Sequence, residues 1–247
     1  MKRIKALFLG LVFLCGVYFL LKIYFLQPVI EKTLQGLTGC KVVSENINLN
    51  LYRSTVQIQD LLILNSPEFH ERIMFDISSL DVDFNVVALL KKETHLNKVK
   101  IDIKEVVVVK KSNGSLNLNE LTVLKADKRG VRPAELATEE IPILSIEVLS
   151  LTIDKLVFID YTLNPKGVRK EYVLNIEEKI QNVDNTYLVV RLIVAQAIKK
   201  AAIANTLDIN VERLTTPLKN IVGYSGNVIK GTVATLSKPL SPKGNSV

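Results

Sequence analysis

The sequence predicts an α+β protein in which a membrane helix is followed by a meander of β-strands and then by further helices. Three patterns support this prediction. Residues 6–26 are apolar apart from one lysine, residues 46–176 repeatedly alternate apolar and polar side chains, and residues 187–204 return to helical spacing. The hydrophobic share of 48% and the mean hydropathy of +0.24 are also high for a wholly soluble chain of 247 residues.

The N-terminal segment has the length and composition of a transmembrane helix. No charged or strongly polar side chain occurs between Ala6 and Leu21, and after Lys22 the apolar run continues to Leu26. A helix of this length spans roughly 32 Å, about the hydrocarbon thickness of a bilayer. A cleaved signal peptide is the alternative, but the run exceeds the usual apolar region of such peptides, and no site of small residues follows it. We therefore expect an uncleaved anchor in residues 1–26.

Basic residues predict the orientation of this anchor. Lys2, Arg3 and Lys5 precede the apolar run, and positively charged flanks stay in the cytoplasm. The N-terminus is then cytoplasmic, and the chain from about residue 27 onward is exported. Cys15 would lie in the bilayer and Cys40 outside it, so no intramolecular disulfide is expected. We expect Cys40 to be a small packed side chain.

The exported part should begin with a short helix and continue with strands. Pro28 suits a first helical turn, and Gly39 suits the end of an amphipathic helix. The apolar period then changes to two, which predicts strands with one apolar and one solvated face, normally antiparallel. These strands fall near 47–51, 56–64, 77–84, 99–103, 106–109, 146–153, 157–159 and 172–176.

The domain organisation follows from these elements. Residues 125–142 are charged and contain Gly130, Pro133 and Pro142, so we expect a mobile insertion there. Helical spacing from about Tyr187 to Ala204 predicts a helix after the last strand. The chain then divides into a cytoplasmic start and anchor (1–26), an exported β domain (27–185), a C-terminal helical region (186–238) and a disordered tail (239–247).

The net charge of +7 sits at the two ends of the chain. Residues 1–22 hold four basic and no acidic residues, residues 191–247 hold eight basic and two acidic ones, and the body between them holds 20 basic and 23 acidic ones. A protein that binds nucleic acid needs a basic face on its folded body. The distribution therefore argues against a nucleic-acid partner and suits contact with a membrane surface.

No pattern in the sequence indicates catalysis. The two histidines, His70 and His95, have no carboxylate or cysteine nearby at ligand spacing. Residues 81–85 imitate the start of a calcium loop, but Val86 replaces its glycine and Lys92 its closing glutamate. The sequence also contains no phosphate-binding glycine loop and no hydrolase elbow. We predict a protein that is not an enzyme and needs no cofactor or metal, with an anchored hydrolase as a distant alternative.

The strands share one long face of isoleucine, leucine and valine, and two interpretations of it are open. The face is either an ordinary core covered by the helix at 187–204 or a partly covered groove that accepts lipid acyl chains. The candidates for the groove lining are Ile47, Leu49, Leu51, Val56, Ile58, Ile77, Val82, Ile101 and Ile103.

Several runs of residues occur in the order found in one family of envelope proteins. After the anchor come 56–69 (VQIQDLLILNSPEF), 77–82, Leu89-Leu90, 99–103, 113–121 (NGSLNLNEL), and 146–151 with 158–161. Together they resemble the AsmA-like family, in which an anchor leads to a strand and then to V-x-I-x-D/N-L-x-I-x-N-P-x-x-F, and N-G-x-x-N-L-x-x-L closes the first block. The resemblance covers roughly residues 1–205 and is strongest over 28–121.

The resemblance implies a single-pass protein of the bacterial inner membrane whose bulk lies in the periplasm. It also implies an elongated, curved sheet with an apolar inner face. The leading prediction is a module that binds phospholipid acyl chains in an apolar β-groove and assists phospholipid transport or outer-membrane assembly. The alternative is an envelope scaffold that docks a protein partner and has a filled core. Members such as AsmA are far longer, and about eight strands at ~4.8 Å make a groove of only about 38 Å, too short for one copy to bridge two membranes.

The C-terminal region carries a weaker pattern. Between Val211 and Leu236, apolar residues recur loosely at helical spacing, and three glycines interrupt them. Each glycine weakens a free helix by up to ~1 kcal/mol, so a helix would form only against a surface. That surface is either the end of the sheet or an anionic membrane leaflet, and a disordered tail is the third interpretation. The candidates for membrane contact are Lys219, Lys230 and Lys238.

Overall fold

The computed structural model describes residues 10, 13, 16, 27–50, 52–85, 95–128, 144–210 and 214. These residues form a mixed sheet of six strands with a few helices, which confirms the α+β class. The strands are β1 (Lys41–Asn50), β2 (Thr55–Leu64), β3 (Ile73–Phe84), β4 (His95–Lys110), β5 (Ser145–Asp160) and β6 (Val168–Val183). The helices are α2 (Gln27–Thr38), η2 (Asn117–Glu120), α4 (Thr122–Lys128), α5 (Thr186–Lys200) and α6 (Ala204–Leu207).

The strands lie in the sheet in chain order, but one neighbouring pair departs from the predicted meander. Strands β1 to β4 pair antiparallel, as do β5 and β6, whereas β4 and β5 are parallel. A parallel pair needs a crossover connection that returns the chain to the end where it started. Residues 111–144 make that connection, and η2 and α4 lie within it.

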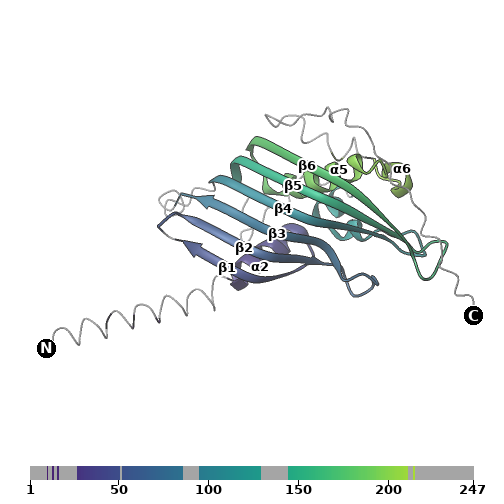
Figure 1. The fold of residues 1–247 in the computed structure, drawn as a ribbon, viewed down its shortest axis with the longest axis horizontal. Coiled ribbons are helices and arrows are strands. Elements are labelled where there is room, and N and C mark those ends of the chain that lie inside the picture. The colour runs from purple at the N-terminus through teal and green to yellow at the C-terminus, as the bar shows by residue number, and fades with distance from the viewer. Residues whose placement is uncertain are drawn as a thin grey trace, which may run out of the picture.

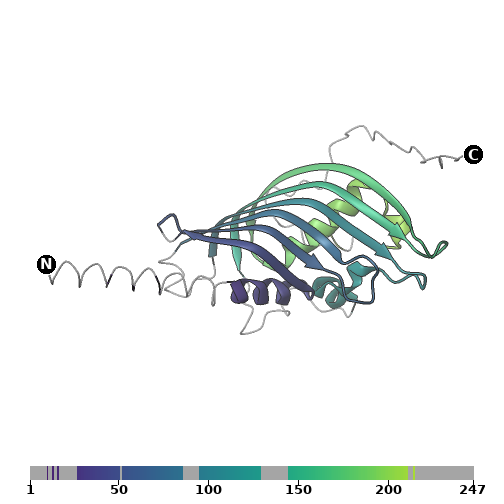
Figure 2. The same cartoon turned by 60° about the horizontal axis from the view of Figure 1, so that its bottom comes forward.

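The sheet is curved, and its concave face holds the helices (Figures 1 and 2). We name its two ends by residues that lie there. The Tyr52 end holds the turn between β1 and β2 and the starts of β4 and β5, and the Asn117 end holds the loops after β2, β4 and β5. Helix α5 follows β6 at the Tyr52 end and crosses beneath the sheet, as Figure 2 shows. It is followed by α6, which lies at the Asn117 end, where Lys110 Nζ donates to the Thr206 carbonyl at 3.2 Å.

A bulge decides how β4 contributes to the core. Two separate runs, 99–103 and 106–109, were expected, but they form one strand. Opposite β3, Ile103 pairs with Ile77 and Glu105 with Asp76, so Lys104 is an extra residue. The extra residue shifts the alternation, because each added residue turns the following side chains to the other face. Val106 and Val108 therefore join the main core, and Val107 and Val109 join a smaller cluster on the outer face.

The C-terminal end of α2 and the start of α5 follow the sequence rules. Gly39 ends α2 with φ +77°, and a Cβ there would lie 2.5 Å from Thr122 Oγ1, so glycine is needed both for conformation and for the close approach of α4. At α5 the Asn185 side chain accepts a hydrogen bond from the Tyr187 backbone N–H at 2.9 Å.

Two further expectations concern single segments. Helix α4 extends through Lys128, so the first residues of the expected insertion at 125–142 are helical, and the rest of that segment lies outside the described residues. Cys40 is buried, as expected of a packed side chain, and burial raises the pKa of its thiol to about 11.

The predicted membrane anchor lies almost wholly outside the described residues. Among the residues that are described, no helix is both long enough and apolar enough to cross a bilayer.

Candidate functional site

The concave face of the sheet is built from rows of paired aliphatic side chains that cross the strands. Of three rows across the middle of the sheet, the one on the side of the Asn117 end is at most 6% exposed and consists of Leu61, Ile77, Ile103, Ile153 and Ile176. The middle row starts with half-buried Ile47 and continues through buried Ile58, Leu80, Ile101 and Leu151. The next row toward the Tyr52 end starts with half-buried Leu49, Val56 and Val82 and continues through buried Val99, Leu149 and Ile180.

These rows divide the predicted lining residues into two groups. Ile58, Ile77, Ile101 and Ile103 lie in one continuous core cluster with residues of α5, η2 and α4. Four further predicted residues are half-buried at the Tyr52 end of β1, β2 and β3, namely Ile47, Leu49, Val56 and Val82. Leu51 lies outside the described residues. We call these four residues, together with half-buried Leu96 at the start of β4, the corner.

Leu96 is the member of the corner that sequence reasoning missed. It pairs with Phe84 on one side and with buried Ile146 on the other. The register between β3 and β4 shifts at Phe84, which turns Leu96 to the same face as Val99 although the two are an odd number of positions apart. A shift of this kind depends on the partner strand, so the alternation within β4 alone gives no sign of it.

The helices explain why the corner is less buried than the rest. From Thr186 to Ile198, every residue of α5 except Val190 is buried, and the helix contacts β5 and β6. At the Asn117 end, Leu118 and Leu121 of the crossover connection are fully buried against the same core. The corner is the part of the concave face whose side chains stay half-buried.

A buried asparagine pair closes the Asn117 end. Asn117 is fully buried, and its Nδ2 donates to Asn65 Oδ1 at 2.9 Å and to the Val107 carbonyl at 2.8 Å. Its Oδ1 accepts from the backbone N–H groups of Val109 and Leu118, both at 2.9 Å. All four side-chain bonds that the amide offers in this geometry are therefore made within the protein.

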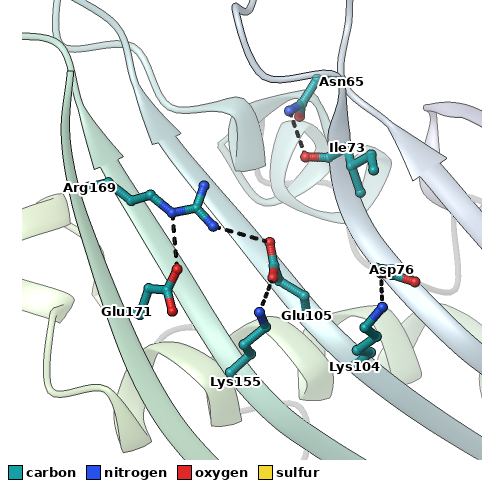
Figure 3. A network of polar contacts seen from close by, with 8 residues as sticks. All are labelled: Asn65, Ile73, Asp76, Lys104, Glu105, Lys155, Arg169 and Glu171. Carbon is teal, nitrogen blue, oxygen red and sulfur yellow. Dashed lines mark hydrogen bonds and ion pairs between the residues drawn. The ribbon is translucent and has the colours of Figure 1, made fainter. Parts of the chain in front are cut away.

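Asn65 extends this network to the loop after β2. Its Nδ2 donates to the carbonyls of Glu71 at 2.8 Å and Ile73 at 3.1 Å, the second of which is drawn in Figure 3. Asn65 belongs to the run 56–69, and Asn117 is one of the three asparagines in the run 113–121. The structure brings these runs together across 52 residues and assigns Asn65 and Asn117 a structural role.

The loop after β2 also covers the outer face at this end. Phe69 is buried against Val107, Val109, Val157 and Ile159. Lys111 Nζ lies 4.2 Å from the centre of the Phe69 ring and 2.8 Å from the Glu68 carboxylate. His70 packs edge-on against Tyr161, with ring centres 5.0 Å apart, so this histidine has an aromatic packing contact.

The remainder of the outer face carries ion pairs within and between strands (Figure 3). Glu105 on β4 contacts Lys155 on β5 at 2.5 Å and Arg169 on β6 at 3.9 Å, and Arg169 also binds Glu171 at 3.1 Å. Lys104 pairs with Asp76 at 3.4 Å. The two faces are thus chemically distinct, because the outer one is charged and the concave one is aliphatic.

One carboxylate lies among the buried residues of the concave side. Glu178 is opposite Leu151 in the sheet and accepts a hydrogen bond from Gln196 Nε2 of α5 at 2.7 Å. Burial raises the pKa of the Glu178 carboxyl, although the Gln196 bond and the nearby Lys199 charge oppose this. The apolar spacing of 187–204 gave no sign of this polar contact.

His95, Ser145 and Glu147 meet at the Tyr52 end of the parallel strands. His95 Nδ1 lies 2.9 Å from Ser145 Oγ, and its Nε2 lies 3.9 Å from Glu147 Oε2. The histidine and glutamate side chains are 44% and 61% exposed. A Ser-His-acid triad needs the carboxylate in hydrogen-bond contact with the ring and shielded from water. This trio has neither feature, and we interpret it as a surface cross-strand contact.

The remaining predicted sites are the membrane-contact lysines and any metal site. The membrane-contact candidates Lys219, Lys230 and Lys238 lie outside the described residues. Among the residues that the structure does describe, no group of three histidine, cysteine, aspartate or glutamate side chains could hold a metal ion. Comparisons of the chain with models of protein families, with curated proteins and with solved structures find no match.

Proposed function

We propose that this chain is an AsmA-like protein anchored in the bacterial inner membrane, whose periplasmic domain binds phospholipid acyl chains at the corner and assists phospholipid transport or outer-membrane assembly. The observation that carries the proposal is the uneven cover of the concave face. One aliphatic row is continuous from Leu49 of β1 to Ile180 of β6. Yet Ile47, Leu49, Val56 and Val82 are only half-buried at the Tyr52 end.

The chemistry of the corner suits an acyl chain. Its five side chains are all aliphatic, and Ile47, Val56, Val82 and Leu96 pack directly on the main core, so a bound chain would extend that core. Each methylene that leaves water contributes about 0.8 kcal/mol. A lipid that moves from a bilayer to the corner exchanges one apolar environment for another, so the acyl chain stays out of water. Binding of this kind needs apolar area and no catalytic group.

The path of the chain supports a position near a membrane. Helix α2 runs antiparallel to β1. Its last residue, Thr38, is three residues from the start of β1. At its first residue, the Gln27 side-chain Nε2 donates to the Ser44 carbonyl, within β1, at 3.1 Å. The N-terminal end of α2 therefore points toward the Tyr52 end. The apolar segment 6–26 immediately precedes Gln27 in the sequence, so the proposed anchor approaches the domain from the side on which the corner lies.

A second candidate function, the envelope scaffold that docks a protein partner, is favoured by a different observation. The middle of the concave face is filled, with Ile58, Ile101 and Ile103 at most 7% exposed. A domain whose core is complete needs no lipid to fold. The corner would then be an incompletely covered edge of that core.

Cross-linking separates the two functions. The full-length protein is reconstituted in vesicles that contain a phospholipid with a photoreactive acyl chain, and the cross-linked peptides are identified by mass spectrometry. We expect cross-links in the peptides that contain Val56 and Val82. Val82→Asp should abolish them and keep a cooperative thermal melt, because a half-buried charge is still partly hydrated.

The matched control is Val173→Asp. Val173 is a β-strand valine that is 73% exposed and pairs with Lys155 of the charged outer face. This variant should keep the cross-links to β2 and β3. If the wild-type protein is cross-linked within residues 6–26 alone, the corner does not bind acyl chains and the scaffold function is favoured.

A further inference from the structure

The turn between β1 and β2 carries the most exposed large hydrophobic side chain among the described residues. Tyr52 is 98% exposed at the tip of this turn. A tyrosine held fully in water gains nothing from its aromatic ring for the fold of its own domain. Tyrosine is enriched where proteins meet the headgroup layer of membranes, because its ring is apolar and its hydroxyl is polar.

The turn is braced, so Tyr52 is held in place and projects from a defined structure. The backbone N–H of Arg53 donates to Asn50 Oδ1 at 2.9 Å, and Ser54 has a φ of 55° that closes the turn. The Ser54 carbonyl accepts from the Phe84 backbone N–H at 3.0 Å, which ties the turn to the end of β3. Arg53, next to Tyr52, carries the positive charge that an anionic membrane surface attracts.

Three separate features place the same end of the domain toward a membrane. The N-terminal end of α2 points that way, the half-buried corner lies there, and the exposed Tyr52 is at its tip. We propose that the β1–β2 turn contacts the headgroup region of the membrane that holds the anchor, with the Tyr52 ring among the lipid headgroups. The inference rests on the proposed membrane anchoring, and it adds the orientation of the domain: the corner faces the bilayer, and the closed Asn117 end faces away from it.

The opposite end of the sheet supplies an internal comparison. Leu163, in the turn between β5 and β6, is 92% exposed and lies at the Asn117 end. Both positions are therefore exposed apolar residues on turns, and they differ in which end of the sheet they occupy. If the domain stands on the membrane at its Tyr52 end, position 163 lies beyond the reach of the lipids.

The experiment uses the absence of tryptophan from the sequence. Tyr52→Trp and Leu163→Trp each introduce a single fluorescent tryptophan into the full-length chain, which is reconstituted in vesicles of phosphatidylcholine and phosphatidylglycerol. The vesicles contain either ordinary phospholipid or phospholipid brominated near the headgroup. A tryptophan at the interface lies close to these bromines, so we expect about a twofold loss of emission for position 52 and an unchanged emission for position 163.

Each outcome has one meaning. Loss of emission at position 52 alone supports the proposed orientation. Equal emission in both kinds of vesicle for position 52, or a loss at position 163 as large as at position 52, overturns it. Vesicle flotation is measured on the same samples, and a chain that does not float overturns both the anchoring and the orientation. A chain that floats but shows no quenching at position 52 overturns the orientation and leaves the cross-linking test of the corner unaffected. Both variants should melt at the wild-type temperature, because both positions are exposed.

Discussion

The two ends of the concave face are made from the same strands and the same kinds of side chain, yet they differ in how they are closed. At the Asn117 end, the row through Ile77 and Ile103 is buried under helices and beside a saturated asparagine network. At the Tyr52 end, Val56 of β2 and Val82 of β3 also pack on the core side of the sheet and are half-buried. The comparison shows that an alternating aliphatic pattern determines which face a residue occupies, and that the covering elements determine how much water it retains.

The largest expected difference between the two ends comes from burying a charge. Ile103→Asp places a carboxylate at a position that is 1% exposed, which should cost about 4 kcal/mol or more and unfold the domain. Val56→Asp, at the corner, should cost about 1–2 kcal/mol, because water still reaches the side chain. Urea denaturation of both variants measures the two free energies of unfolding. Equal losses would show that the corner is as dry as the filled end.

The next effect concerns the network that closes the Asn117 end. Asn117→Ala leaves the Val109 and Leu118 N–H groups and the Asn65 amide without their partner in a fully buried place, and we expect a loss of about 3 kcal/mol.

Asn113→Ala is the matched control, because Asn113 lies in the same connection, is exposed, and bonds only locally to the Ser115 N–H in the structure. We expect this control to lose less than about 1 kcal/mol. Thermal or urea denaturation compares the two, and a loss for Asn117→Ala no greater than for Asn113→Ala would contradict the structural role of the network.

The smallest effect is the pH dependence of Glu178, at the far end of the middle row. Because the folded protein raises the pKa of this carboxyl above its ordinary value of 4.5, the proton is bound more tightly when the chain is folded. The contribution of Glu178 to stability therefore rises as the pH falls through the raised pKa, and at neutral pH its ionised form carries a burial cost.

Glu178→Gln removes this cost and keeps an acceptor for Gln196. At pH 8 we expect the variant to have a slightly higher melting temperature than the wild type, with a gain in the free energy of unfolding of less than about 1 kcal/mol. Near pH 4 the two proteins should melt at the same temperature. Melting curves at several pH values test the sign. A variant less stable than the wild type at pH 8 would show that the ionised carboxylate stabilises the fold.

Local patterns recovered α2, α5 and the inward faces of the strands, although they divided β4 and β5 into two runs each. Gly39 predicted the end of α2, and the alternation at Ile47, Val56 and Ile101 correctly predicted strands whose inward faces are aliphatic. These signals are local, since each depends on backbone preferences or on a period within one segment. The expected lining residues accordingly lie on one face wherever the structure describes them.

Non-local pairing decided the rest. The parallel contact of β4 with β5, the register shift that turns Leu96 inward, and the meeting of Asn65 with Asn117 all join residues that no local window contains. The sequence alone was enough to indicate a sheet with an aliphatic face, because side-chain alternation is a property of each strand. Which part of that face is filled by helices and which part stays half-buried at the corner was decided only by the tertiary structure, because burial depends on the elements that pack against a residue from elsewhere in the chain.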